Sequence, residues 1–175
     1  MYLCYMKIEN NKMVWMTDVE YKLVTSRIPI PGVDLVILRK TGKGLETLLI
    51  KNKINRAANG MWGLIGGRQY LGETLDVTIQ RQAKELGLKV KVIPPFSFEF
   101  PAMVNSSTKQ DTHKHPTCNV YPVIVISGKL KKTGNEHEDL KWFDVADLPN
   151  ICLDQGRQIK ITLNKLKQYS KYLKL

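Results

Sequence analysis

A chain of 175 residues, of which 43% are apolar and 25% charged, is long enough for one domain with a real core and too short for two ordinary ones. No apolar run approaches the roughly 20 residues that cross a bilayer, so we expect no association with a membrane. The opening residues, MYLCYMKIENNK, do not have the pattern of a signal peptide. The net charge of +11 favours polyanionic partners, namely nucleotides, nucleic acid or an anionic surface.

The cysteines indicate the redox compartment. Cys4, Cys118 and Cys152 are odd in number and far apart in the sequence. This spacing argues against a disulfide scaffold and against a zinc ribbon, and it favours a reducing, cytoplasmic location.

The first half of the chain contains a predicted strand pair. Residues 1–30 have no clear periodicity and are expected to form an N-terminal arm, and residues 31–175 are expected to form the main domain. Two apolar runs, Val33–Leu38 and Thr47–Ile50, are separated by the turn-forming residues Thr41–Gly44. A third short strand is predicted at Met61–Ile65, after the turn signal Asn59-Gly60.

The period of the apolar residues changes at Thr74. From there they recur at the spacing of a helix, in the order Leu75, Ile79, Ala83 and Leu86. Gly87 follows in the position typical of a residue just past a helix end. Beyond it the sequence predicts strands at residues 89–93, 96–100, 120–127 and 140–145, and a polar loop over residues 101–116. The whole pattern predicts an α/β (α+β) fold in which a mixed β-sheet lies between α-helices.

The last 25 residues predict an amphipathic helix. Its apolar positions Ile159, Leu163, Leu166 and Leu173 recur at helical spacing, and its basic residues occupy the remaining positions. We favour a solvated basic surface here over a dedicated nucleic-acid-binding helix.

The candidate site lies in GGRQYLGETLDVTIQRQAKELG, residues 66–87. Glu73 stands at the predicted helix start, where the helix dipole favours a carboxylate, and Arg81 and Glu85 share one helix face. Arg68 and Arg81 are suited to gripping phosphates, and Glu85 is suited to Mg²⁺, which takes oxygen ligands. An ordinary amphipathic helix with a surface Arg–Glu pair is the simpler alternative for any one of these residues alone.

Taken together, the spacing resembles the Nudix box, G-x5-E-x7-R-E-U-x-E-E-x-G-U, where U is a bulky apolar residue. Gly67, Glu73 and Arg81 match without adjustment, whereas Gly87 comes one residue early. Anchored on Gly87, the tail keeps Glu85 and has Lys84 in place of an acid. The resemblance covers roughly residues 31–149 and implies the Nudix fold.

Within that family the form GGR…ETL…R…ELG resembles the branch of GDP-mannose mannosyl hydrolase, whose members attack the anomeric carbon of the sugar with one Mg²⁺. The resemblance implies that Gly66, Glu85 and Glu136 hold Mg²⁺, with Mn²⁺ as a substitute. Glu136 departs from the branch, which has Gln at this position. His137 is then the candidate general base, because an imidazole titrates near operating pH.

The same resemblance places Asp34 on the sugar and Arg68 and Arg81 on the diphosphate leaving group. It also suggests a homodimer formed through the N-terminal arm. The remaining constellation, His113, His115 and Cys118, is compatible with a transition metal, but we favour a polar surface or substrate-facing loop.

Three functions remain open from the sequence. The first is a Mg²⁺-dependent hydrolase that cleaves a nucleoside diphosphate (NDP) sugar at carbon. The second is a Nudix pyrophosphohydrolase that cleaves an NDP-sugar, dinucleotide or nucleotide at phosphorus. The third is a non-catalytic module that binds nucleotides or RNA. The nucleobase and the sugar are not determined by the sequence.

Overall fold

The computed structural model describes residues 6–10, 12–28, 30–52, 60–93, 98–100, 116–131, 137–152 and 155–173. Within them, the main sheet has the strand order β10-β4-β3-β9-β7. These strands are β3 (Ile30–Thr41), β4 (Gly44–Asn52), β7 (Leu88–Val92), β9 (Pro116–Gly128) and β10 (His137–Asp144). The β3–β9 pairing is parallel and the other pairings in this order are antiparallel, so the sheet is mixed.

Three short strands also pair with strands of this sheet. They are β5 (Trp62–Gly63), which pairs with β4, β6 (Ile65–Arg68), which pairs with β3, and β8 (Phe98–Phe100), which pairs with β9. The predicted strand at residues 61–65 is therefore two strands. The glycines after it continue the second strand, because they pair with β3 where the sequence suggested the start of a loop.

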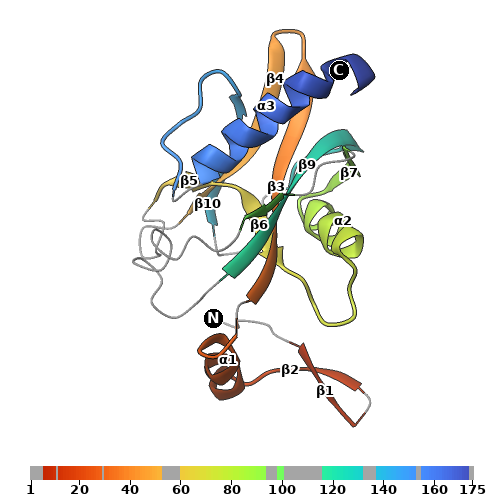
Figure 1. The fold of residues 1–175 in the computed structure, drawn as a ribbon, viewed down its shortest axis with the longest axis vertical. Coiled ribbons are helices and arrows are strands. Elements are labelled where there is room, and N and C mark those ends of the chain that lie inside the picture. Colours follow the sequence, from red (N-terminus) through yellow and green to blue (C-terminus); the bar gives the residue numbers. More distant parts are fainter. Residues whose placement is uncertain are drawn as a thin grey trace.

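Two helices cover opposite faces of the sheet, α2 (Leu75–Glu85) on one and α3 (Gln155–Leu173) on the other (Figure 1). The alternation of β3 explains this arrangement. Leu35 and Ile37 face the core that contains Ile79 of α2, and the intervening Val36 faces the core that contains Ile159 of α3. All five side chains are at most 1% exposed. The predicted layers, with helices on both faces of a mixed sheet, are confirmed.

Local signals fix both ends of α2. The Thr74 side chain caps its first turn by accepting a hydrogen bond from the Val77 N–H at 3.3 Å. Gly87 follows the helix with φ of +76°, and a Cβ there would lie 2.5 Å from the carbonyl oxygen of Lys129. Only glycine meets both conditions, so the predicted end of the helix is confirmed.

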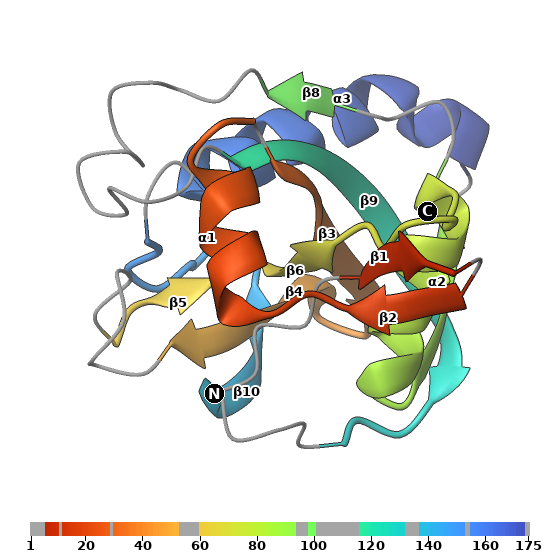
Figure 2. The ribbon, with the colours of Figure 1, turned by 90° about the horizontal axis from the view of Figure 1, so that it is seen from below.

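The N-terminal segment has more structure than the sequence predicted. Residues expected to form an unpatterned arm contain the hairpin of β1 (Met6–Glu9) and β2 (Lys12–Trp15) and the helix α1 (Asp18–Thr25). Thr17 and Glu20 form a capping box at the start of α1. This N-terminal unit, residues 6–28, lies at one end of the sheet in Figures 1 and 2.

Two later strands are longer than predicted. β9 begins at Pro116 and β10 at His137, because pairing with β3 and β4 extends each strand beyond its apolar run. Most of the predicted 101–116 loop lies outside the described residues. None of the helices in the described ranges is long and apolar enough to cross a membrane.

Candidate active site

Gly66 and Gly67 allow two polar side chains to lie directly against β6. Gly66 is the register partner of Asp34 on β3, and a Cβ at Gly66 would collide with the Asp34 carboxylate. A Cβ at Gly67 would lie 2.9 Å from Nε2 of Gln82 on α2. Because glycine has no Cβ, the Asp34 carboxylate can lie against Gly66 and the Gln82 amide can lie against Gly67.

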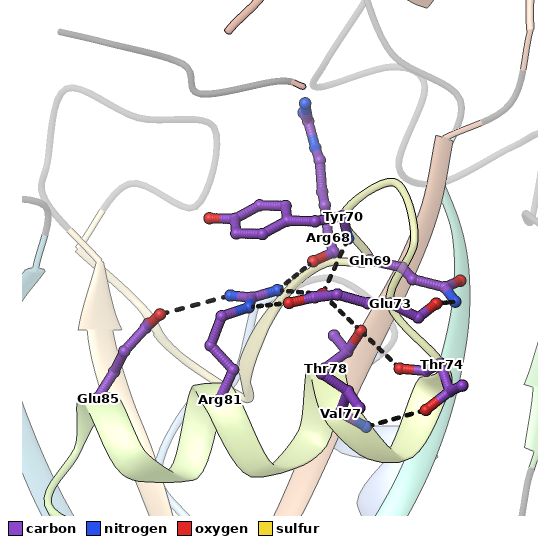
Figure 3. Close-up of polar contacts among 9 residues, drawn as sticks. All are labelled: Arg68, Gln69, Tyr70, Glu73, Thr74, Val77, Thr78, Arg81 and Glu85. Atoms are coloured by element: carbon purple, nitrogen blue, oxygen red, sulfur yellow. Dashed lines mark hydrogen bonds and ion pairs between the residues drawn. The ribbon is translucent and has the colours of Figure 1, made fainter. Parts of the chain in front are cut away.

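Among the carboxylates that the structure describes in residues 66–87, Glu73 accepts the most hydrogen bonds (Figure 3). Arg81 donates to it from Nε at 2.7 Å and from Nη2 at 3.0 Å. The Tyr70 N–H and the Thr78 hydroxyl also donate, at 3.0 and 2.9 Å. The Arg81 hydrogen bonds, followed by those of Tyr70 and Thr78, lower the pKa of Glu73 from 4.5 to about 2 despite its burial. Glu73 is therefore ionised at neutral pH.

Arg81 connects the loop at residues 68–73, called the box loop below, to helix α2. Its Nη2 donates to the backbone carbonyl of Arg68 at 2.8 Å, and its guanidinium stacks on the Tyr70 ring at 3.8 Å. Nη1 lies 3.4 Å from Oε1 of Glu85, one helical turn away. In this structure the guanidinium thus holds the loop, Glu73 and Glu85 relative to one another.

Arg68 extends away from Glu85 in Figure 3. Its Nη2 donates to the hydroxyl of Tyr21, a residue of α1 that is only 4% exposed, at 2.6 Å. Trp15 at the end of β2 makes an edge contact with Tyr70, with ring centroids 5.9 Å apart. The N-terminal unit therefore contacts the box loop at two points.

A pocket of about 250 Å³ lies between β3, β6, α2 and the start of α3. Its polar lining comes from Asp34, Asn52, Gly66, Gln82, Glu85 and Gln155. Asp34 is 8% exposed and Gln82 4% exposed, whereas the Glu85 side chain is 59% exposed. The structure thus brings together three of the predicted site residues, Asp34, Gly66 and Glu85. Arg68 and Arg81 do not line this pocket.

Sequence reasoning missed the amides of this pocket. Gln155 Oε1 accepts hydrogen bonds from the Leu64 N–H at 2.8 Å and from the Cys152 thiol at 3.4 Å. Asn52 Nδ2 donates to the carbonyl oxygen of Met61 at 3.2 Å. Residues 52 and 155 are far apart in the sequence, and neither belongs to a motif that would have identified it. Gln82 lies inside residues 66–87, but the sequence predicts no role for it.

The other predicted residues lie wholly or partly beyond the described structure. The backbone of His137 pairs with pocket-lining Asn52 at the first register position of β10 and β4, but its side chain is not described. Glu136, His113 and His115 lie outside the described residues, and Cys118 is described only as backbone in β9.

The donor atoms of the pocket suit Mg²⁺. No group of three or more His, Cys, Asp or Glu side chains occurs among the described residues. The pocket nevertheless collects oxygen donors, from the carboxylates of Asp34 and Glu85 to the Gln82 Oε1, which is buried without a hydrogen-bond partner in the described structure. Mg²⁺ needs only one or two protein carboxylates when phosphate oxygens complete its shell.

The sequence matches the NUDIX domain family over residues 29–162. The chain belongs to this family and is a Nudix hydrolase. It is 34% identical over 133 residues to an ADP-ribose pyrophosphatase of Methanocaldococcus jannaschii, covering 75% of this chain and 72% of that protein. It is 27% identical to the low-salt glycan biosynthesis protein Agl8 of Haloferax volcanii, covering 73% and 78%.

Solved structures show the same fold. The NUDIX domain of Shewanella oneidensis NrtR, crystallised with ADP ribose, superposes with a TM-score of 0.59 at 23% identity. The match covers 86% of this chain and 99% of that domain.

Proposed function

We propose that the protein is a Mg²⁺-dependent hydrolase of an NDP-sugar that attacks the anomeric carbon and releases NDP and free sugar. One observation carries this proposal: Asp34, Gly66 and Glu85 meet in a pocket whose described lining has only two carboxylates. Few acids suit one metal ion better than several. One metal ion is sufficient when the leaving group is an intact diphosphate.

The roles of the individual residues follow from their chemistry. Glu85, the Gly66 carbonyl and Glu136 would hold Mg²⁺, with Mn²⁺ as a substitute, and the bound metal would neutralise the departing diphosphate. Asp34 would accept hydrogen bonds from sugar hydroxyls. His137, whose backbone lies beside pocket-lining Asn52, would take the proton of the attacking water.

We assign different roles to Arg81 and Arg68. Arg81 already binds Glu73 and the loop carbonyl, so we assign it the task of holding Glu85 in place. Arg68 donates to the Tyr21 hydroxyl, which holds its guanidinium in place, and we assign it to the diphosphate.

The names of two relatives bear on the substrate. One relative is named for glycan biosynthesis, which supports a sugar nucleotide as the substrate. The relative named ADP-ribose pyrophosphatase favours a second candidate, cleavage of the diphosphate at phosphorus.

One assay separates these candidates. The purified protein is incubated with Mg²⁺ and GDP-mannose, ADP-ribose, dinucleotides or nucleoside triphosphates in water enriched in ¹⁸O. We expect NDP and free sugar, with ¹⁸O in the sugar. A nucleoside monophosphate with a sugar phosphate would establish attack at phosphorus instead. No turnover, together with tight and salt-sensitive RNA binding, would support a binding module.

A further inference from the structure

Gln82 is a buried amide that makes no side-chain hydrogen bond to the described residues. It lies on the third turn of α2, is 4% exposed and lines the pocket. Neither its Nε2 nor its Oε1 has a hydrogen-bond partner in the described structure. Leaving a buried polar group unpaired is unfavourable, and an alkyl side chain of the same size would avoid that cost. The amide is therefore suited to a ligand that enters the pocket.

The other two amides of the pocket have fixed orientations. Nδ2 of Asn52 donates to a backbone carbonyl, so its Oδ1 is the atom that remains for a ligand. Oε1 of Gln155 accepts a backbone N–H, so its Nε2 remains. Backbone groups cannot exchange donor for acceptor, and both amides are consequently held in one of their two flips. The pocket thus combines an acceptor from Asn52, a donor from Gln155, and both from Gln82.

This combination matches hydroxyl groups better than phosphate. A hydroxyl both donates and accepts, so it pairs with the Asn52 acceptor and the Gln155 donor alike, whereas an ionised phosphate only accepts. No lysine or arginine lines the pocket within the described residues. The apolar lining that the structure describes is aliphatic, from Ile50, Leu64, Ile65 and Leu86, and this part of the pocket has no aromatic ring on which a nucleobase could stack.

The size of the pocket agrees with a part of the substrate. Its volume of about 250 Å³ is below the roughly 300 to 1,000 Å³ of pockets that enclose a drug-sized ligand. One sugar ring is a suitable occupant, whereas a whole sugar nucleotide is not.

We propose that Gln82, with Asn52 and Gln155, forms an amide-lined subsite that binds the hydroxyl groups of the substrate's sugar. This inference rests on the proposed NDP-sugar substrate. Gln82 donates to one hydroxyl and accepts from another, which makes it a specificity-determining residue for the sugar.

The test is the substitution Gln82→Met, which keeps the length of the side chain and removes both polar atoms. We expect an unchanged or raised melting temperature, because an unpaired amide is replaced by an apolar group. KM for GDP-mannose or ADP-ribose should rise roughly 5- to 150-fold, the equivalent of two neutral hydrogen bonds. The inhibition constant of GDP or ADP, which lack the sugar, should change less than about twofold.

Gln80→Met is the matched control. Gln80 lies two residues away on the same helix, is exposed and does not line the pocket, so its substitution should leave KM and the inhibition constant unchanged. Any change in melting temperature would reflect its hydrogen bond to the Val90 carbonyl. Gln82→Leu serves as a second variant, because it also removes both polar atoms and adds no charge beside Asp34 and Glu85. It should raise KM for the sugar nucleotides in the same selective way.

Other results would overturn the subsite. Equal weakening of GDP and GDP-mannose, with a lower Mn²⁺ affinity measured by electron paramagnetic resonance, would make Gln82 a contact of the metal or diphosphate. Unchanged constants in both Gln82 variants would leave the amide without a role in binding.

Binding without metal separates this proposal from the proposed function. Thermal shifts compare ADP-ribose with ADP in wild type and Gln82→Met. A preference for ADP-ribose that Gln82→Met abolishes would support the subsite even if the wild type hydrolyses no NDP-sugar. The absence of any preference would overturn the subsite even if hydrolysis occurs.

Discussion

At the scale of single residues, the box separates into groups that hold the loop and groups that face the pocket. Glu73 accepts hydrogen bonds from Arg81, Tyr70 and Thr78, and its side chain is 14% exposed. Within the described residues, Glu85 has one side-chain contact, to Arg81 at 3.4 Å, and it is 59% exposed beside the pocket. The two glutamates are therefore expected to respond differently to the same substitution.

Glu73→Gln should destabilise the fold by about 2 to 3 kcal/mol at neutral pH, because it removes a charged partner of Arg81. Since folding lowers the pKa of Glu73 from 4.5 to about 2, its contribution is complete above pH 4.5 and is lost as the pH falls toward 2. The difference in unfolding free energy between wild type and variant should therefore shrink over that window. Urea titrations from pH 7 to pH 3 measure it, and a difference that is constant with pH would contradict the assignment.

Glu85→Gln should have the opposite profile. The side chain is largely exposed, so the melting temperature should be close to that of the wild type. Turnover with Mg²⁺ should fall by at least the roughly 10- to 100-fold that loss of an outer-shell metal partner costs. Direct Mn²⁺ titration provides the second measurement. Near-full activity with unchanged Mn²⁺ affinity would remove Glu85 from the metal site.

At the scale of elements, the box loop (residues 68–73) lies between α2 and the N-terminal unit. Arg81 ties it to α2, and Tyr21 and Trp15 contact it from α1 and β2. A loop held on both sides keeps Arg68 and Tyr70 in place before any ligand arrives, which reduces the entropy lost on binding.

Tyr21→Phe tests this clamp by removing only the hydroxyl that accepts from Arg68. Stability should fall by about 1 kcal/mol or more, because the lost hydrogen bond is made by a charged donor. Amide hydrogen exchange should accelerate in residues 68–73 and remain unchanged in β7. Val19→Ser is the control: this residue of α1 is 77% exposed, so its substitution should change neither quantity. Equal exchange in loop and strand would argue against a local clamp.

At the scale of the whole molecule, apolar periodicity predicted the elements that bury one or both faces in the core. The apolar residues recurring along α2, followed by Gly87, predicted that helix, and the run at Val33–Leu38 predicted the central strand. The N-terminal unit was missed because α1 is short and leaves Val19 and Leu23 exposed, so it has no continuous apolar stripe. The capping box at Thr17 and Glu20 was the signal that could have found it.

The site was predictable to the extent that its residues belong to one motif. Glu85 follows from its spacing to Arg81 in the box, whereas Gly66 and Asp34 follow only from the resemblance to one branch of the family. The amides of Asn52 and Gln155 could not be found this way. Their orientations depend on hydrogen bonds to the backbone of Leu64 and Met61, the residues on either side of β5, and the pairing of β5 with β4 places these groups.

The division of the chain into an N-terminal unit and a main domain leads to the last prediction. Among the residues whose side chains the structure describes, the members of both apolar cores lie between residues 33 and 166, and none comes from the N-terminal unit. A chain without residues 1–28 should therefore still unfold cooperatively, and its circular dichroism spectrum should still show the secondary structure of the main domain. It should lose the Tyr21 and Trp15 contacts, so residues 68–73 should exchange faster and be cleaved sooner by a protease.

The loss of these contacts also has a kinetic consequence. Because Arg68 and the loop would no longer be held in place, KM for the sugar nucleotide should rise while the affinity for Mn²⁺, which depends on the pocket, changes little. Tyr21→Phe should reproduce part of this effect in the full-length chain. If the shortened chain fails to fold, the N-terminal unit belongs to the core of the domain. If it folds with an unchanged KM, the contacts to the loop have no role in substrate binding.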